Sequence, residues 1–156
     1  MPKITEKILE LLEKREFVSI GTATRDGRPN SVPKLFFRIQ EDFIYLIDHV
    51  MGQTVRNIKE NPLVSVSFMD QDALEGYRLN GSAKVIERGK KYDAMLKEWN
   101  ERAVKLSANR VIEGLRTGKK HEHYEVEISE KFVILKIKVN HVIKVGRRGD
   151  IWKESD

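Results

Sequence analysis

The stretch that most constrains the fold of this chain is residues 17–37, FVSIGTATRDGRPNSVPKLFF. Its first part alternates β-branched residues with small or aromatic ones, which is the period-2 pattern of a strand. Asp26-Gly27 follows, and the glycine accepts the positive φ that a type I′ hairpin turn requires. An extended apolar run then resumes and ends at Phe37. The stretch therefore predicts two antiparallel strands joined by a type I′ turn.

Two prolines, Pro29 and Pro33, lie in the second of these strands. Proline has no N–H to donate to a sheet ladder, so it belongs at a sheet edge or where a strand opens. The polar pair Asn30-Ser31 stands between the two prolines. Such a strand leaves backbone groups free to meet a ligand, and we expect this hairpin to form one wall of a binding site.

The rest of the chain predicts further strands from apolar or alternating runs and helices from helical spacing. Gly81 is expected at a bulge or a close backbone contact. The longest helix is expected to carry one apolar face from Tyr92 to Leu115 and to break near 107–109. The expected strands are 43–47, 63–69, 77–87 and 124–139, the last extended through Val145, and the expected helices are 5–15, about 54–60 and 90–116.

Six or so antiparallel strands in short hairpins, interrupted twice by helices, favour a mainly β protein with a closed or split barrel. A parallel α/β sheet would need helices that alternate with strands. The length of 156 residues suits one domain. We therefore expect a single domain over 1–156, with a helical insertion at about 90–116.

Composition excludes several kinds of chemistry. The chain has no cysteine, which rules out disulfides, iron–sulfur clusters and thiolate catalysis. Of its four histidines, His121 and His123 are two residues apart, which is not a zinc spacing with further ligands nearby. No nucleophile-elbow, Walker or dinucleotide-binding glycine motif is present. We expect neither a metal site nor a catalytic triad.

The formal charge of +5 suits a solvated basic surface or attraction to a phosphate-bearing ligand. Acidic residues are interspersed with the basic ones and no nucleic-acid motif appears, so we expect no nucleic-acid partner. The N-terminal segment is amphipathic and charged, unlike a secretory signal. No apolar run approaches the roughly 20 residues of a membrane span. These features predict a cytoplasmic protein with no membrane partner.

The start of the helix near residue 53 is a candidate phosphate site, because backbone N–H groups at a helix N-terminus favour anions. Thr54 can add a hydroxyl group, and Arg56 can add a forked, permanently charged donor. The alternative is that Thr54 only caps the helix and Arg56 is a solvated surface residue.

Several short motifs, in order along the chain, resemble the FMN-binding split-barrel superfamily, which includes pyridoxamine 5′-phosphate oxidase. They are Gly21-Thr22-Ala23-Thr24, Asp26-Gly27-Arg28-Pro29, Val32-Pro33, the strand 44–48 before the helix start at 53–58, Asn61-Pro62 with the strand 64–66, and 76–83. The resemblance implies a six-stranded antiparallel split β-barrel with Greek-key topology. It also implies a homodimer that binds FMN between its subunits.

The resemblance also implies roles for individual residues. Asn30, Ser31, Val32, Pro33 and Lys34 would run along the isoalloxazine edge, with main-chain groups around Val32 at the pyrimidine side; Gln53, Thr54 and Arg56 would surround the phosphate, and Asp48 and Asn57 would support that loop. Family members often carry a cation near 53–54, so here Arg56, Arg25 or Lys34 would have to compensate.

The expected function is that of an FMN-dependent oxidoreductase. The flavin would pass electrons to a small-molecule or redox-protein acceptor, and no catalytic side chain is identified. The chain has 146–152, GRRGDIW, where pyridoxamine 5′-phosphate oxidases carry an Arg-x-His motif. This difference argues against pyridoxamine oxidation itself. The alternatives are a deazaflavin- or haem-binding barrel, or a protein that binds or stores a phosphorylated ligand without turnover.

Overall fold

The structure is a computed structural model and describes residues 4–118 and 131–154. These residues fall into two compact units. The first unit comprises the described residues up to Ile86 and from Phe132 onward, and the second comprises those from Glu87 to Lys131. The first unit holds α1 (Glu6–Glu13), β1 (Phe17–Ala23), β2 (Pro29–Gln40), β3 (Phe43–Asp48), α2 (Gln53–Glu60), β4 (Leu63–Asp70), β5 (Glu75–Ile86), β6 (Val133–Val145) and β7 (Ile151–Glu154), and the second holds α3 (Lys90–Thr117).

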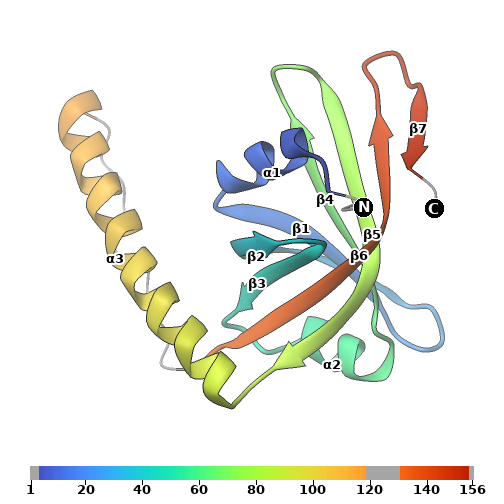
Figure 1. The fold of residues 1–156 in the computed structure, drawn as a ribbon, viewed down its shortest axis with the longest axis horizontal. Coiled ribbons are helices and arrows are strands. Elements are labelled where there is room, and N and C mark those ends of the chain that lie inside the picture. The colour runs from blue at the N-terminus through green and yellow to red at the C-terminus, as the bar shows by residue number, and fades with distance from the viewer. Residues whose placement is uncertain (1–3, 119–130, 155–156) are drawn as a thin grey trace. The chain divides into compact units, whose positions relative to one another are not determined.

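Six strands of the first unit form a closed antiparallel barrel (Figure 1). They follow the order β3-β2-β1-β4-β5-β6, and pairing between β3 and β6 closes the sheet. Strands β1 to β3 are consecutive hairpins, and β4 returns beside β1 after α2, which is the Greek-key connection. The prediction of a mainly β, six-stranded split-barrel fold is therefore confirmed. The short strand β7 extends the sheet beyond β6 and was not predicted.

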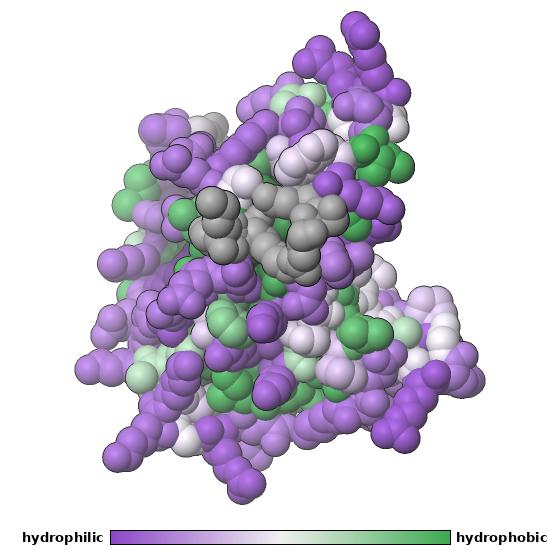
Figure 2. Space-filling model, turned by 45° about the vertical axis from the view of Figure 1, so that its right-hand side comes forward, coloured by the Kyte–Doolittle hydropathy of each residue, from purple (hydrophilic) through white to green (hydrophobic). Residues whose placement is uncertain are grey.

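The barrel interior is filled by alternate residues of each strand. In β1, Val18, Ile20 and Thr22 point inward and are buried, whereas Phe17 is exposed. Ile8 and Leu12 of α1 belong to the same apolar cluster, so α1 covers part of this core. Thr5 caps that helix, as its hydroxyl accepts a hydrogen bond from the Ile8 N–H. The outer surface in Figure 2 is mostly hydrophilic, with scattered apolar patches.

The turn between β1 and β2 differs from the prediction. A type I′ turn needs positive φ at both central residues, and here Gly27 has a φ of 86° but Asp26 does not have positive φ. The Gly27 N–H bonds to the Thr24 carbonyl, and the Thr24 N–H bonds to the Arg28 carbonyl. The hairpin therefore closes through a three-residue turn with a left-handed glycine, which is the G1-bulge arrangement.

Two expectations for α3 are wrong. The helix runs without a break through 107–109, because Ser107 stays helical and donates its hydroxyl to the Ala103 carbonyl. Its buried residues are Met95, Trp99 and Ala103, whereas Val111 and Leu115 are exposed, so the buried face does not reach the end of the helix.

No helix among the described residues is long and apolar enough to cross a membrane. The predicted strand start at 124–130 lies outside the described residues.

Gly81 lies at a close contact between β5 and β6. The β5–β6 register shifts between Asn80 and Gly81, which confirms the predicted bulge. A Cβ atom at Gly81 would lie 1.9 Å from the carbonyl oxygen of Lys138. A side chain at this position would push the two strands apart, because backbone atoms cannot move aside as a flexible side chain can.

We predict that Gly81→Ala lowers the free energy of unfolding by about 3 kcal/mol or more, since overpacking against backbone is costly. Gly76→Ala in the same strand is the control, because a Cβ there would meet only Val145 Cβ at 3.8 Å. Urea unfolding of both variants measures the difference. Equal stability of the two variants would contradict the close contact at Gly81.

Candidate functional site

The N-terminal half of β2 has a strand neighbour on one side only. β1 pairs with β2 from Pro29 to Leu35, whereas β3 pairs with β2 only from Leu35 onward. No described strand covers the second side of residues 29–34. Pro29 and Pro33 therefore lie on a free sheet edge, as predicted from their missing N–H groups.

The register shows which main-chain groups are free at this edge. Hydrogen bonds join Thr24 to Arg28 and Glu16 to Phe36, so the even-numbered residues of β2 bond toward β1. In an antiparallel strand, the main-chain groups of successive residues point to alternate sides. The odd-numbered residues of β2 therefore direct their N–H and C=O groups away from β1. The outward groups among residues 29–34 are therefore the C=O groups of Pro29, Ser31 and Pro33 and the N–H of Ser31. The N–H and C=O of Val32 point toward β1 instead.

The N-terminus of α2 presents bare backbone N–H groups. Its N-cap is Gly52, which has no side chain to cap the helix, so the alternative that Thr54 is the N-cap is wrong. The first helical hydrogen bond runs from the Arg56 N–H to the Gly52 carbonyl at 3.2 Å. The N–H groups of Gln53, Thr54 and Val55 therefore have no partner in the helix, which favours an anion.

Buried polar side chains join the free edge of β2 to this helix start. Asn30 Nδ2 donates to Thr54 Oγ1 at 3.2 Å and to Thr22 Oγ1 at 3.4 Å. Asn57 Nδ2 also donates to Thr22 Oγ1, at 3.0 Å. Thr22, Thr54 and Asn57 are buried, so these bonds fix β1, β2 and α2 relative to one another. Thr22 was missed by sequence analysis, although a polar residue at an inward position of β1 could have indicated it.

The same network continues to the exposed side of α2. Gln53 Nε2 donates to Asn57 Oδ1 at 2.6 Å, and Arg56 donates to Gln53 Oε1 at 3.0 Å. Arg56 is exposed and uses one of its five N–H donors in this contact. The predicted phosphate residues Gln53, Thr54 and Arg56 are thus together in the first turn of α2.

A buried ion pair lies where β2 and β3 separate. Lys34 Nζ is 2.8 Å from Asp48 Oδ1, and both side chains are less than a tenth exposed. The same Oδ1 accepts hydrogen bonds from the N–H groups of Val50 and Met51, which shapes the loop before α2. Asp48 Oδ2 is buried without a hydrogen-bond partner among the described residues.

The Lys34–Asp48 ion pair helps to identify which cation could bind a phosphate. The charge of Lys34 is already neutralised by Asp48. Arg25 donates its Nε to the Glu60 carbonyl, at the other end of α2. Of the three cations considered from the sequence, Arg56 is therefore the one placed at the helix N-terminus.

His49 follows Asp48 and was not among the predicted site residues. Burial lowers the pKa of its imidazole below the usual value of 6.5; the carboxylate of Asp48 opposes this and the ammonium of Lys34 adds to it. The ring contacts Phe132 edge to face, with centroids 5.5 Å apart. His49 is therefore neutral at pH 7. Among the described residues, no three His, Asp or Glu side chains are grouped as metal ligands.

A groove of about 590 Å³ opens beside the free edge of β2. Asn30 and Ser31 lie on one side, and small residues let the groove reach the backbone. Its lining includes Gly21, Ser65 and Gly81, the amides Asn61, Asn80 and Asn140, and His141, and among the described lining residues there is no Lys, Arg, Asp or Glu. This volume is in the usual range for small-molecule sites.

The family follows from comparison with known proteins. The sequence pattern of the pyridoxamine 5′-phosphate oxidase family matches residues 4–146, so this chain belongs to that family. An uncharacterised protein of Methanocaldococcus jannaschii is 30% identical over 90 residues, which span 56% of this chain and 59% of that relative.

Many solved structures share the fold. HupZ of Group A Streptococcus has a TM-score of 0.68 at 21% identity, with 92% of this chain and 95% of that chain covered. A pyridoxamine 5′-phosphate oxidase-related, FMN binding protein of Nostoc punctiforme has a TM-score of 0.54 at 13% identity, with 90% and 87% covered. A haem binding protein of Mycobacterium smegmatis has a TM-score of 0.58 at 19% identity, with 92% and 54% covered.

We predict that Asp48→Asn lowers the free energy of unfolding by about 3–5 kcal/mol, because Lys34 is left as a buried, unpaired cation. The Asn side chain can still accept from Val50 and Met51, so the loss reports the ion pair. The double variant Asp48→Asn, Lys34→Met should recover most of the loss in urea unfolding. An Asp48→Asn protein as stable as the wild type would show that the pair does not hold this end of the barrel.

Proposed function

We propose that this protein binds FMN beside the free edge of β2, with the phosphate at the N-terminus of α2, and acts as an FMN-dependent oxidoreductase. The observation that carries the proposal is the hydrogen bond between Asn30 and Thr54. It holds a strand edge with free main-chain groups against a helix start with free N–H groups. A flavin mononucleotide needs both, since its ring offers amide-like groups and its tail ends in a phosphate.

The proposed phosphate contacts come from α2. The backbone N–H groups of Gln53 and Thr54 would donate to the phosphate oxygens, helped by the helix dipole. Arg56 would supply the positive charge, as it is exposed and keeps donors beyond its bond to Gln53. The polar residues behind this turn, Asn57 and Asn30, would hold it in place rather than touch the phosphate.

The proposed ring contacts come from β2. The N–H of Ser31 can donate to a ring carbonyl or nitrogen, and the C=O groups of Ser31 and Pro33 can accept from a ring N–H. The Lys34–Asp48 pair lies directly behind this edge and fixes where it ends. When bound, FMN supplies hydride or single-electron transfer to a small-molecule or redox-protein acceptor, while the protein orients it and limits the access of water.

We further propose that the working form is a homodimer. The groove that would receive the ring is open along one side and is lined by small residues, which allow a second backbone to approach closely. Leu63, which also lines the groove, is about two-thirds exposed and would gain cover from a partner subunit. The cytoplasmic location and the single-domain organisation stay predictions from the sequence.

Haem is the second candidate ligand. It is supported by the shared fold with the haem binding protein of M. smegmatis. It is also supported by His141, an exposed imidazole in the groove of the kind that can ligate iron. FMN is favoured over haem because the free main-chain N–H and C=O groups at the edge of β2 suit the amide-like groups of a flavin ring, which a porphyrin lacks, while the helix N-terminus with Arg56 suits the phosphate.

We predict that Arg56→Ala weakens FMN binding by about 1.5–3 kcal/mol, the range for a hydrogen bond to a charged group. Riboflavin lacks the phosphate, so its affinity should be equal for the wild type and the variant. Lys59→Ala, in the last turn of the same helix, is the control and should change neither affinity. Flavin fluorescence titration measures all three proteins.

An Arg56→Ala protein that loses FMN and riboflavin affinity alike would contradict the phosphate assignment. Sedimentation velocity on the FMN-loaded samples should show a species of two chains. A monomer that still binds FMN tightly would contradict the proposed dimeric site while leaving the phosphate assignment intact.

A further inference from the structure

A second cavity, of about 390 Å³, lies between α1 and the β6–β7 hairpin. It shares no lining residue with the groove beside β2. Its walls come from the N-terminus of α1, from β5 and β6, from the turn at Gly146 and from β7. This cavity is therefore separate from the proposed flavin site and from the β3–β6 pairing that closes the barrel.

The cavity has an apolar floor and one aromatic wall. Ile8 and Val142 form part of the floor and are almost completely buried. Tyr77 adds its ring, which is stacked on Phe68 with centroids 5.3 Å apart and is therefore fixed. Trp152 of β7 lines the opposite side and is 53% exposed. A half-exposed indole over an apolar floor is suited to stacking with a flat ring.

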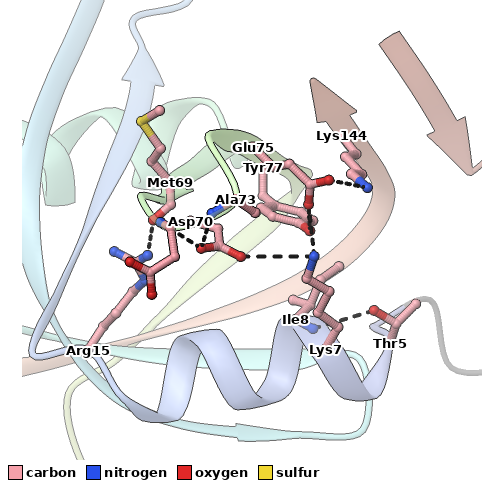
Figure 3. Close-up of polar contacts among 11 residues, drawn as sticks. Thr5, Lys7, Ile8, Arg15, Met69, Asp70, Ala73, Glu75, Tyr77 and Lys144 are labelled. Atoms are coloured by element: carbon pink, nitrogen blue, oxygen red, sulfur yellow. Dashed lines mark hydrogen bonds and ion pairs between the residues drawn. The ribbon is translucent and has the colours of Figure 1, made fainter. Parts of the chain in front are cut away.

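Two ammonium groups line the same cavity and are held by one carboxylate behind them (Figure 3). Lys7 Nζ donates to Glu75 Oε2 at 2.8 Å, and Lys144 Nζ is 2.8 Å from Glu75 Oε1. The Tyr77 hydroxyl donates to Oε2 as well, at 3.0 Å. Lys7 also lies 3.9 Å from Asp70 Oδ2. An ammonium group has three donors, so each lysine keeps donors for a further acceptor.

These charges persist across a wide pH range. The hydrogen bonds from Lys144 and Lys7 lower the pKa of Glu75 to about 2. The bond to Glu75 in turn raises the pKa of each lysine above its usual value. The two lysines are thus cationic and anchored at one end, which lowers the entropy that a ligand would otherwise lose in ordering them.

We propose that this cavity is a second ligand site and that it binds a small aromatic carboxylate. The ring would stack against Trp152 above the floor of Ile8 and Val142. The carboxylate would accept charge-assisted hydrogen bonds from Lys7 and Lys144.

The charge of the lining sets the ligand's own charge. Asp150 also lines the cavity, with both carboxylate oxygens close to where a Cβ atom on Gly146 would lie. The lining itself holds two ammonium groups and one carboxylate, and the Glu75 carboxylate in contact with both lysines balances the second positive charge. A site with so little net charge favours a ligand with at most one negative charge over a phosphate or polyphosphate ester, which Asp150 and Glu75 would repel.

Isothermal titration calorimetry with 2-naphthoate and its uncharged isostere 2-naphthamide tests the proposal. The wild-type protein should bind naphthoate about tenfold or more tightly than naphthamide, as expected for loss of a charge-assisted hydrogen bond. Lys144→Met should reduce that preference, because only Lys7 remains to bind the carboxylate, and Trp152→Ala should weaken binding of both probes. Lys138→Met, an exposed lysine of β6 outside the cavity, should change nothing.

Lys144→Arg separates recognition from folding, because it retains a cation that can hold Glu75. It should keep the preference for naphthoate, and thermal unfolding should show it to be folded. Excess FMN should leave naphthoate binding unchanged. Equal affinity for both probes, a preference that Lys144→Met leaves undiminished, binding that Trp152→Ala does not weaken, or displacement of naphthoate by FMN would each overturn the second site. The comparisons of the two probes and of the variants do not depend on whether the flavin proposal holds.

Discussion

The buried Lys34–Asp48 ion pair determines where the barrel of this protein opens. Leu35 and Ile47 form the last rung of the β2–β3 ladder, and Lys34 and Asp48 come next in each strand. A 2.8 Å ion pair between their side chains stands where the next rung would be. β3 leaves the sheet beyond this point and leads to α2, while β2 continues with one free edge. Because a buried charge needs its partner, the position of the opening is strongly fixed.

The candidate site depends on this separation in two ways. Residues 29–34 gain a free edge because β3 no longer covers them, and Asp48 shapes the loop that delivers the N-terminus of α2. The buried hydrogen bonds of Thr22, Asn30, Thr54 and Asn57 then hold the two parts together. The family match and the shared fold agree on a split barrel. The proposed binding of a phosphorylated, planar ligand depends on this arrangement of β2 and α2.

Local chemistry explains how much of this could be predicted from the sequence. Pro29, Pro33 and Gly81 each carry a backbone restriction that is independent of the rest of the fold, so they indicated the free edge and the bulge correctly. The partner of Lys34 could not be predicted in this way, because it depends on the register of two strands. β7 was missed because a four-residue strand with exposed Ile151 and Trp152 has no clear periodicity. The helix break predicted at Ser107 was wrong, since its hydroxyl donates to the Ala103 carbonyl within the helix.

The proposed function rests on the binding of FMN at the opening of the barrel. The most direct test is the absorption spectrum of the purified protein, followed by identification of any cofactor released on denaturation. We expect a yellow protein with a flavin spectrum that releases FMN rather than FAD. A colourless protein that takes up no added FMN would contradict the proposed function, and so would a protein that carries haem in place of flavin.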